Sequence, residues 1–251
     1  MAYKEHVVFT RPDDLNIKIW RYMDFSKFVS ILDTESLFFP RSDKLGDPFE
    51  GTYSRANRNL RPHIYKDVKN IDFDSVAKTF AEFSAKARMY TQINCWHMNN
   101  YESDAMWKLY LKSGEGIAIQ STYSNLVKAL EEEKKDIFIG KVIYLDYSKE
   151  WMPDGNSFSP FVHKQIFFQH ENELRAVVQE FPSNNKGIDW SASHPQDGIN
   201  IKINVETLIE KVYIAPTSPS WIFDLVSSII KKYGFNFEVL QSKLSETPVY
   251  Y

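Results

Sequence analysis

The stretch from Ile93 to Ser121, INCWHMNNYESDAMWKLYLKSGEGIAIQS, constrains the fold most, because almost none of its residues is left without a predicted element. Residues 93–97 predict a strand whose odd-numbered side chains share one face. Asn100 or Ser103 then caps a helix in which apolar side chains repeat at i, i+3 and i+4. The apolar run that ends the stretch predicts an interior strand. A strand, a helix and a strand packed this closely are expected in the middle of a domain.

The composition fits one domain. The chain has 251 residues, 43% of them hydrophobic and 15% aromatic, and no linker-like stretch interrupts it, so a single domain over residues 1–251 is expected. Only 9 residues are glycine, and neither GxGxxG nor the P-loop pattern occurs, which disfavours the glycine-rich nucleotide-binding folds. The net charge of -3 gives no reason to expect general affinity for nucleic acid.

The cysteine usage and the hydropathy indicate where the protein works. Cys95 is the only cysteine, so no disulfide can form within the chain. Residues 1–14 lack the apolar region of a signal peptide. No run approaches the roughly 18 apolar residues that a membrane span needs. We therefore expect a cytoplasmic protein without a membrane segment.

Short strands and amphipathic helices alternate along the rest of the chain. Residues 19–22 predict a strand and residues 25–33 a helix, and a long strand is expected over 137–147. Residues 171–178 are apolar in their second half, which predicts a strand that enters the core. Residues 182–198 predict a long polar loop. The expected fold class is α+β, with a mixed, largely antiparallel sheet that is split or strongly twisted and flanked by helices.

Two carboxylates stand out as candidates for chemistry. Glu171 and Glu173 are two residues apart on the predicted strand and would point to one face. Their mutual repulsion should raise one pKa, which suits a pair that orients a hydroxyl and stabilises developing positive charge. The ordinary alternative is an exposed pair bonded to Arg175, Lys164 or His170.

Two arginines are candidates for anion binding. Arg21 lies between Trp20 and Tyr22, which look buried, and an arginine in such a setting is normally paired with a carboxylate or a bound phosphate. Arg41 lies with the Asp47/Glu50 pair in the loop over residues 41–51, where these residues form either a stabilising ion network or part of a ligand rim.

Other polar residues carry weaker signals. The basic residues of 54–70 form either a solvated surface or a contact surface for phosphates, which keeps nucleic acid open as a partner. Cys95 and His97 share a predicted strand face, but no orienting third group or second metal-ligand pair accompanies them. Cys95 is therefore interpreted as a core residue, and His97 at the strand end is the better site candidate.

Several segments resemble a bacterial family called Domain of Unknown Function 2971. The family name implies no established activity. The resemblance covers nearly the whole chain, and its blocks are WRY at 20–22, FFPRSDKLGDPFEG at 38–51, CWHMN to GEGIAI at 95–119, HENELRAV at 170–177, IAPTSP at 214–219 and VLQSKL at 239–244.

The order of an aromatic-Arg-Tyr strand, a helix, a short strand and a late E-x-E strand is similar to the ADP-ribosyltransferase fold. This resemblance implies that Arg21 holds the phosphates of NAD, a substrate here. It implies that Glu173 stabilises the oxocarbenium-like transition state as nicotinamide leaves, and that Glu171 positions the acceptor. The middle motif of that superfamily is only loosely matched, by residues 120–122.

The same resemblance extends to a wider NAD-binding set. Besides Arg21, the expected contributors to the cofactor site are Tyr22, Arg41, Trp96, His97 and Tyr101, with Tyr22, Trp96 or Tyr101 stacking on a base. Arg21 and Glu173 should then meet in one cleft. Substituting Glu173→Gln should abolish turnover with little change in stability.

Three hypotheses about function follow, and whether the chain is an enzyme stays open. The first is an NAD-consuming, ADP-ribosyltransferase-like transferase or glycohydrolase in stress response or phage defence, acting on a small-molecule or nucleotide ligand. The second is a metal-dependent nuclease or phosphoesterase in which Asp47, Glu171 and Glu173 hold a divalent ion and Lys164 assists. The third is a non-catalytic sensor or interaction module whose working surfaces are residues 54–70 and 182–198.

Overall fold

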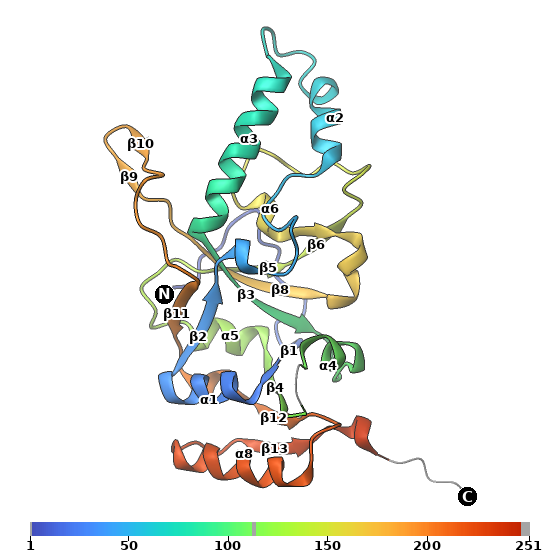
Figure 1. Cartoon of the computed structure of the whole chain (residues 1–251), viewed down its shortest axis with the longest axis vertical. Coiled ribbons are helices and arrows are strands. Elements are labelled where there is room, and N and C mark those ends of the chain that lie inside the picture. The colour runs from blue at the N-terminus through green and yellow to red at the C-terminus, as the bar shows by residue number, and fades with distance from the viewer. Residues whose placement is uncertain (1, 112–113, 247–251) are drawn as a thin grey trace, which may run out of the picture.

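A seven-stranded sheet forms the centre of the protein in the computed structural model, which describes residues 2–111 and 114–246 (Figure 1). Its strands lie in the order β13-β12-β4-β1-β3-β8-β5. Within the described strands of this sheet, only the β12–β13 pairing is parallel, so the mixed, largely antiparallel α+β fold predicted from the sequence is confirmed. The bounds are β13 (Glu238–Gln241), β12 (Lys211–Ile214), β4 (Gly116–Thr122), β1 (Lys18–Asp24), β3 (Thr91–Met98), β8 (Glu173–Gln179) and β5 (Phe138–Lys141).

The sheet is split between β1 and β3. These strands pair only at Ile19–Met98 and Trp20–His97, whereas β1 and β4 stay paired from Lys18 to Asp24. From Arg21 onward β1 therefore leaves β3, and a gap opens in the middle of the sheet. The gap matters for function because backbone edges and side chains there are not covered by a neighbouring strand.

Three short strand pairs accompany the main sheet. They are β2 (Ser36–Pro40) with β11 (Gly198–Lys202), β6 (Ile143–Leu145) with β7 (His163–Gln165), and β9 (Ser183–Asn184) with β10 (Gly187–Ile188). The strand expected over residues 137–147 is thus divided between β5 and β6, which belong to different sheets. The segment 182–198, expected to be a loop, contains the β9–β10 hairpin, which projects from the body of the protein (Figure 1).

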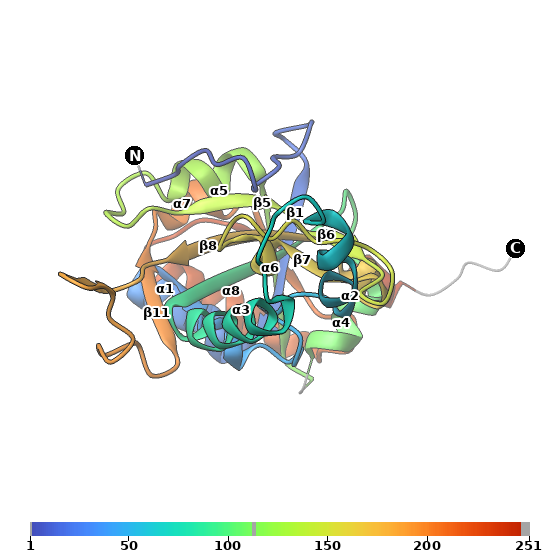
Figure 2. The ribbon, with the colours of Figure 1, turned by 90° about the horizontal axis from the view of Figure 1, so that it is seen from above.

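The helices cover both faces of the sheet and extend beyond one end of it. In Figure 1, α8 lies at one end of the molecule, and α3 rises with α2 at the other. Figure 2, turned by 90°, shows α5 and α7 on one side and α3 on the opposite side. The helices are α1 (Phe25–Thr34), α2 (Arg55–Ile64), α3 (Phe73–Ala87), α4 (Asp104–Tyr110), α5 (Tyr123–Ala129), α6 (Ser159–Val162), α7 (Val205–Leu208) and α8 (Ser220–Lys232). Short 3-10 turns are η1 (Ser42–Lys44), η2 (Arg88–Tyr90), η3 (Ile166–Glu171) and η4 (Lys243–Ser245).

Apolar side chains bury the sheet on both faces. The largest cluster includes Ile19, Ile117 and Leu174 with residues of α1, α5 and α8. On the other face, Trp20 and Tyr22 pack with Met106, Trp107 and Ala118. Because strand neighbours alternate in direction, the side chain of Arg21 starts from the face opposite to Trp20 and Tyr22.

The start of β8 differs from the prediction. Glu171 is the last residue of η3 and is not part of a strand, because Asn172, which has a left-handed backbone conformation with φ of 37°, separates it from β8. The expected strand over residues 171–178 is therefore shorter at its first end. Among the described residues, no helix combines the length and apolar character that a membrane crossing requires.

Candidate functional site

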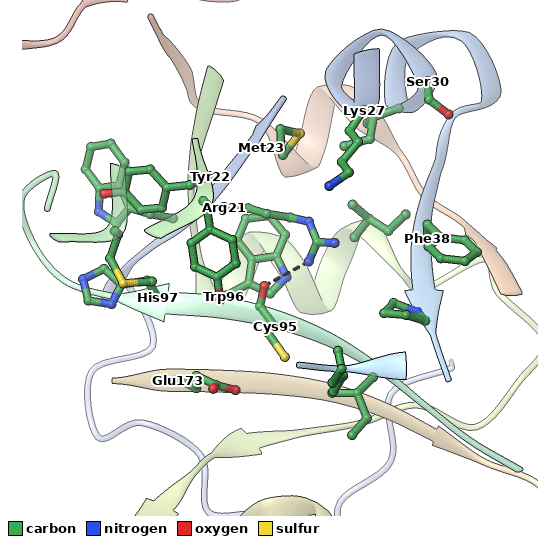
Figure 3. Close-up of a pocket in the computed structure, with 18 of the residues that line it drawn as sticks. Arg21, Tyr22, Met23, Lys27, Ser30, Phe38, Cys95, Trp96, His97 and Glu173 are labelled. Atoms are coloured by element: carbon green, nitrogen blue, oxygen red, sulfur yellow. Dashed lines mark hydrogen bonds between the residues drawn. The ribbon is translucent and has the colours of Figure 1, made fainter. Parts of the chain in front are cut away.

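A cavity of about 630 Å³ opens where β1 and β3 part (Figure 3). Its walls come from seven elements, β1, α1, β2, β3, α4, β8 and β11, and from Leu45, the residue that follows η1. Elements that lie far apart in the sequence are thus brought around one hollow by the split in the sheet. The lining residues from the central strands are Trp20, Arg21, Tyr22, Met23, Ile93, Cys95, Trp96, His97 and Glu173.

Arg21 lines the cavity without a carboxylate partner among the described residues. Its Nη1 donates a hydrogen bond to the backbone oxygen of Cys95 at 2.9 Å, which fills an open position at the edge of β3. Its guanidinium carbon lies 6.0 Å from the ring centroid of Trp96. Burial lowers the pKa of the guanidinium, because no anion compensates for the lost water. A guanidinium with spare donors in a cavity is suited to an anionic ligand.

Glu173 lines the same cavity and belongs to a buried ion network. Its Oε1 accepts a hydrogen bond from Lys164 Nζ at 2.6 Å, and its Oε2 accepts one from Arg175 Nε at 2.7 Å. Arg175 also donates to both carboxylate oxygens of Glu50, at 2.6 and 2.8 Å. Lys164 donates in addition to Glu171 at 2.8 Å. The ordinary reading of the acid pair, ion pairing to Lys164 and Arg175, is therefore what the structure shows, although the pair is buried and not exposed.

The network separates the pKa values of the two acids. Burial raises the pKa of Glu171 to about 7, and the neighbouring Glu173 carboxylate adds to the effect. Burial opposes ionisation of Glu173 too, but Arg175, Glu171 and Lys164 outweigh it and hold the pKa of that carboxyl far below its usual range. Glu173 is consequently a permanent anion, and Glu171 is the member of the pair that exchanges a proton near neutral pH.

His97 lies directly opposite Glu173 in the pairing of β3 with β8. Its Nδ1 lies 2.7 Å from the backbone oxygen of Glu171, and since a carbonyl can only accept, Nδ1 is the donor. Burial lowers the pKa of His97, so the ring is neutral at pH 7 and its Nε2 is an acceptor. No described residue bonds to this Nε2.

The cavity spans the gap between the strands and reaches both faces of the sheet. His97 and Glu173 share one face with Trp20, and Arg21 starts from the other. The Arg21 side chain nevertheless reaches the free edge of β3, as its bond to Cys95 shows. Arg21 and Glu173 therefore line one cavity, although they are far apart in sequence.

The remaining residues predicted for the site divide into two groups. Tyr22 and Trp96 line the cavity, and the Tyr22 hydroxyl accepts a hydrogen bond from Ser103 N at 2.8 Å. Arg41 is not among the lining residues, because Asp43 holds its guanidinium at 2.7 and 2.8 Å and His194 lies 2.7 Å from its Nη1.

Tyr101 is also absent from the lining and is 78% exposed. Arg41 is therefore in an ion pair, as one alternative expected, but its partner is Asp43 and not the Asp47/Glu50 pair, because Glu50 is bound to Arg175. The structure places Tyr101 outside the cavity because the loop that follows β3 turns this side chain to the surface.

The acids proposed to hold a metal ion do not assemble. Among residues 2–111 and 114–246, no group of three or more His, Cys, Asp or Glu side chains is placed to bind a metal. Asp47 accepts a hydrogen bond from the backbone of Phe49, and Lys164 neutralises Glu171 and Glu173. An ammonium that bridges two carboxylates occupies the place a divalent ion would need.

The basic stretch 54–70 is partly structural. Arg61 is buried, pairs with Asp154 at 3.0 Å and lies 4.3 Å from the ring centroid of Phe80. Arg58 is exposed and forms an ion pair with Asp74 at 3.6 Å. Arg61, one of the cations expected for a phosphate-binding surface, is therefore part of the packing of α2 against α3.

The sequence did not indicate the roles of two residues of the site. Glu50 was expected to join Arg41 in an ion network or a ligand rim of the loop 41–51, yet it pairs with Arg175, 125 residues away. Cys95 contributes its backbone oxygen, which no side-chain pattern reveals. A charged residue inside an apolar strand, such as Arg175 in ELRAVVQ, was the available clue that a buried partner exists.

The chain matches no protein-family model, so the resemblance to Domain of Unknown Function 2971 rests on the sequence segments alone. No curated protein matches the sequence. Solved structures that resemble this chain include DarT of Thermus sp. 2.9 in complex with NAD+, with a TM-score of 0.41 and 11% identity over 95% of this chain and 100% of that one. The same protein in complex with carba-NAD+ has a TM-score of 0.37 and 10% identity over 92% of this chain and 97% of that one.

Proposed function

We propose that the cavity binds NAD as a substrate and that the protein transfers the ADP-ribosyl group to water or to another acceptor. The observation that supports this most is the pairing of opposite charges in one cavity: Arg21 without a carboxylate partner, and Glu173 as a permanent anion. The two groups match the two charged features of the reaction, a substrate pyrophosphate and a developing cation.

Arg21 supplies the anion-binding end of this proposal. A partly buried guanidinium without a counter-ion among the described residues is unfavourable, and a bound phosphate would reduce that penalty. Lys27, which also lines the cavity, adds a second positive charge, held loosely by Asp24 at 3.6 Å. Two cations near one another are what a pyrophosphate requires.

The arrangement of ring systems suits a dinucleotide. In Figure 3, Tyr22 and His97 lie at one end of the cavity, Phe38 at the other, and the Arg21 guanidinium between them. A dinucleotide has the same order, with a ring at each end and phosphates in the middle. The volume of about 630 Å³ falls within the range of about 300–1,000 Å³ typical of small-molecule sites.

Glu173 acts by charge in this mechanism and not as a base. The bond between ribose C1′ and the nicotinamide nitrogen breaks, the electron pair leaves with nicotinamide, and C1′ becomes cationic. An acceptor oxygen then bonds to C1′ and releases its proton to the surrounding water. A carboxylate whose pKa lies far below its usual range cannot take that proton efficiently, but it stabilises the cation.

Calorimetry with NAD and measurement of nicotinamide release by chromatography test the proposal. The wild-type protein should bind NAD and release nicotinamide, and Glu173→Gln should release none while Arg21→Met binds NAD more weakly. Lys211→Met, which removes an ion-paired lysine from the far strand β12, is the matched control and should behave as wild type. Absence of both NAD binding and nicotinamide release, with water and with added protein or nucleotide acceptors, would overturn the proposal.

A further inference from the structure

The two-stranded sheet β6–β7 places two side chains against the first residue of β8. Tyr144 and Lys164 are Cα partners in the parallel pairing of these strands. The Tyr144 hydroxyl accepts a hydrogen bond from the backbone N–H of Glu173 at 2.8 Å. The Lys164 ammonium donates to Oε1 of the same residue at 2.6 Å. One register pair therefore holds both the backbone and the carboxylate of Glu173.

Lys164 is itself held on several sides. Its Nζ donates to Glu171 at 2.8 Å and lies 4.5 Å from the ring centroid of Phe168. Only 9% of its side chain is exposed. Glu171 and Glu173 lie on either side of Asn172, whose backbone is left-handed, and both accept a hydrogen bond from this ammonium.

We propose that Lys164 is a positioning residue for the reaction proposed above, which fixes the ionised carboxylate of Glu173 in one orientation at the cavity. The inference rests on the proposed function and deepens it. With Lys164 on one oxygen and Arg175 on the other, the carboxylate cannot rotate without losing a charge-assisted hydrogen bond. Its negative charge is thereby placed before the substrate arrives, as electrostatic stabilisation of a transition state requires.

The charge count of the network shows why the lysine is needed. Three carboxyl groups, those of Glu50, Glu171 and Glu173, face two cations, Lys164 and Arg175. Loss of the lysine would leave three acids with one guanidinium, so at least one of them would hold a proton at higher pH. In a plot of kcat against pH, the decrease on the acidic side should then begin at a higher pH, because less Glu173 is ionised there.

The other titratable groups near the pair stay neutral at pH 7. Burial raises the pKa of Cys95, Tyr110 and Tyr144. Burial lowers the pKa of His97. Burial also opposes the charge on Lys164, but Glu173 outweighs it, so the pKa of the ammonium is raised and the lysine remains charged. The charge on Glu173 therefore depends on Lys164, Arg175 and Glu171, and Glu171 is the member of this network whose pKa, about 7, lies near neutrality.

The test measures the pH dependence of kcat and KM for nicotinamide release in Lys164→Met, Lys164→Arg, Tyr144→Phe and Lys211→Met. For Lys164→Met we expect kcat at pH 7 to fall about tenfold or more, while KM for NAD changes less than about twofold. The acidic limb of the pH profile, where kcat falls as the pH falls, should move to higher pH. Lys164→Arg, which keeps the charge, should restore the position of that limb. Tyr144→Phe should lower kcat about threefold with KM unchanged, since only a backbone acceptor is lost. Lys211→Met should match the wild type.

A second readout needs no activity. Carbon NMR of protein labelled at the glutamate carboxyls should show a carboxyl pKa raised in Lys164→Met relative to wild type and Lys211→Met. An unchanged titration, or a variant that only melts earlier with the same kcat and the same acidic limb, overturns the inference. If the wild type releases no nicotinamide, the proposed function fails, and the NMR titration alone decides whether Lys164 keeps Glu173 ionised. Should Lys164→Met not fold, Lys164→Gln, which removes the charge but keeps a hydrogen-bond donor, takes its place in both measurements.

Discussion

Trp20 of β1 and His97 of β3 form the last paired position before these strands part. The next residue of β1 is Arg21, and the residue opposite His97 on β8 is Glu173. The point where the sheet splits is therefore also the point where a cation and an anion reach the same cavity. The predictions below follow from this relationship and from the ion network behind it.

Replacing Glu173 by glutamine should abolish nicotinamide release and also destabilise the protein. The sequence alone suggested little change in stability, but Glu173 is the shared partner of Lys164 and Arg175 in a buried network. Removing one member of a buried ion pair typically costs about 3–5 kcal/mol. Chemical denaturation gives the free energy of unfolding, and a variant as stable as the wild type would contradict the reading of the network.

Replacing Arg21 by methionine should weaken NAD binding about tenfold or more while leaving stability unchanged or higher. A partly buried guanidinium with one hydrogen bond and no counter-ion in the part of the chain that the structure describes contributes little to the folded state, whereas a phosphate ligand depends on it. Calorimetry and thermal unfolding measure the two effects separately. A large loss of stability with unaltered affinity would show that the arginine is structural.

Glu171 should make the protein less stable as the pH rises through neutrality. Its pKa in the folded protein is raised to about 7, so its stabilising contribution is complete below its unfolded pKa and is lost as the pH rises through the folded value. The free energy of unfolding should fall by on the order of 2 kcal/mol between pH 5 and pH 8 from this group. Urea titrations of wild type and Glu171→Gln check this, and the glutamine variant should lack that part of the fall.

Glu173 should have the opposite effect in acid. Its pKa is depressed in the folded protein, so its contribution is present above the unfolded pKa of about 4.3 and is lost as the pH falls toward the folded value. Wild type should therefore lose stability more steeply below pH 5 than Glu173→Gln. Parallel slopes in denaturation experiments between pH 5 and pH 3 would count against a depressed pKa.

Arg175 and Glu50 should be energetically coupled. Their two hydrogen bonds, at 2.6 and 2.8 Å, lie between side chains that are each 1% exposed. Each single substitution, Arg175→Met or Glu50→Gln, should destabilise by about 3–5 kcal/mol, and the double variant by clearly less than the sum. Denaturation of the wild type and the three variants gives the free energies of unfolding for this double-mutant cycle. If the two single losses add up to the loss in the double variant, the pair is not coupled.

Arg41→Gln should lower the melting temperature without changing the affinity for NAD. Arg41 holds Asp43 and contacts Pro195, and it does not line the cavity. Tyr101→Ala serves as the neutral comparison, because this side chain is 78% exposed and also outside the cavity. If Arg41→Gln binds NAD more weakly but is as stable as the wild type, Arg41 contributes to NAD binding and the prediction is wrong.

Local patterns in the sequence determined much of the fold. Ser103 caps α4 with its hydroxyl, and residues 93–97 and 116–119 form central strands, because caps and alternating side chains act over a few residues. The mixed, largely antiparallel sheet follows from such short elements. The unusual residues of the strands, Arg21 and the acid pair, were also recognisable from the sequence, since charge inside an apolar strand requires a partner.

Only the tertiary structure decided which partner each charge received. The sequence left Arg21 with a carboxylate or a ligand as alternatives, and the split between β1 and β3 gave it a cavity. The left-handed turn at Asn172 moved Glu171 off the strand, and Glu50 reached Arg175 across 125 residues. Pairings of this kind depend on where the chain returns in space, and electrostatic energy depends on that distance and on the burial of the charges, neither of which is encoded in local spacing.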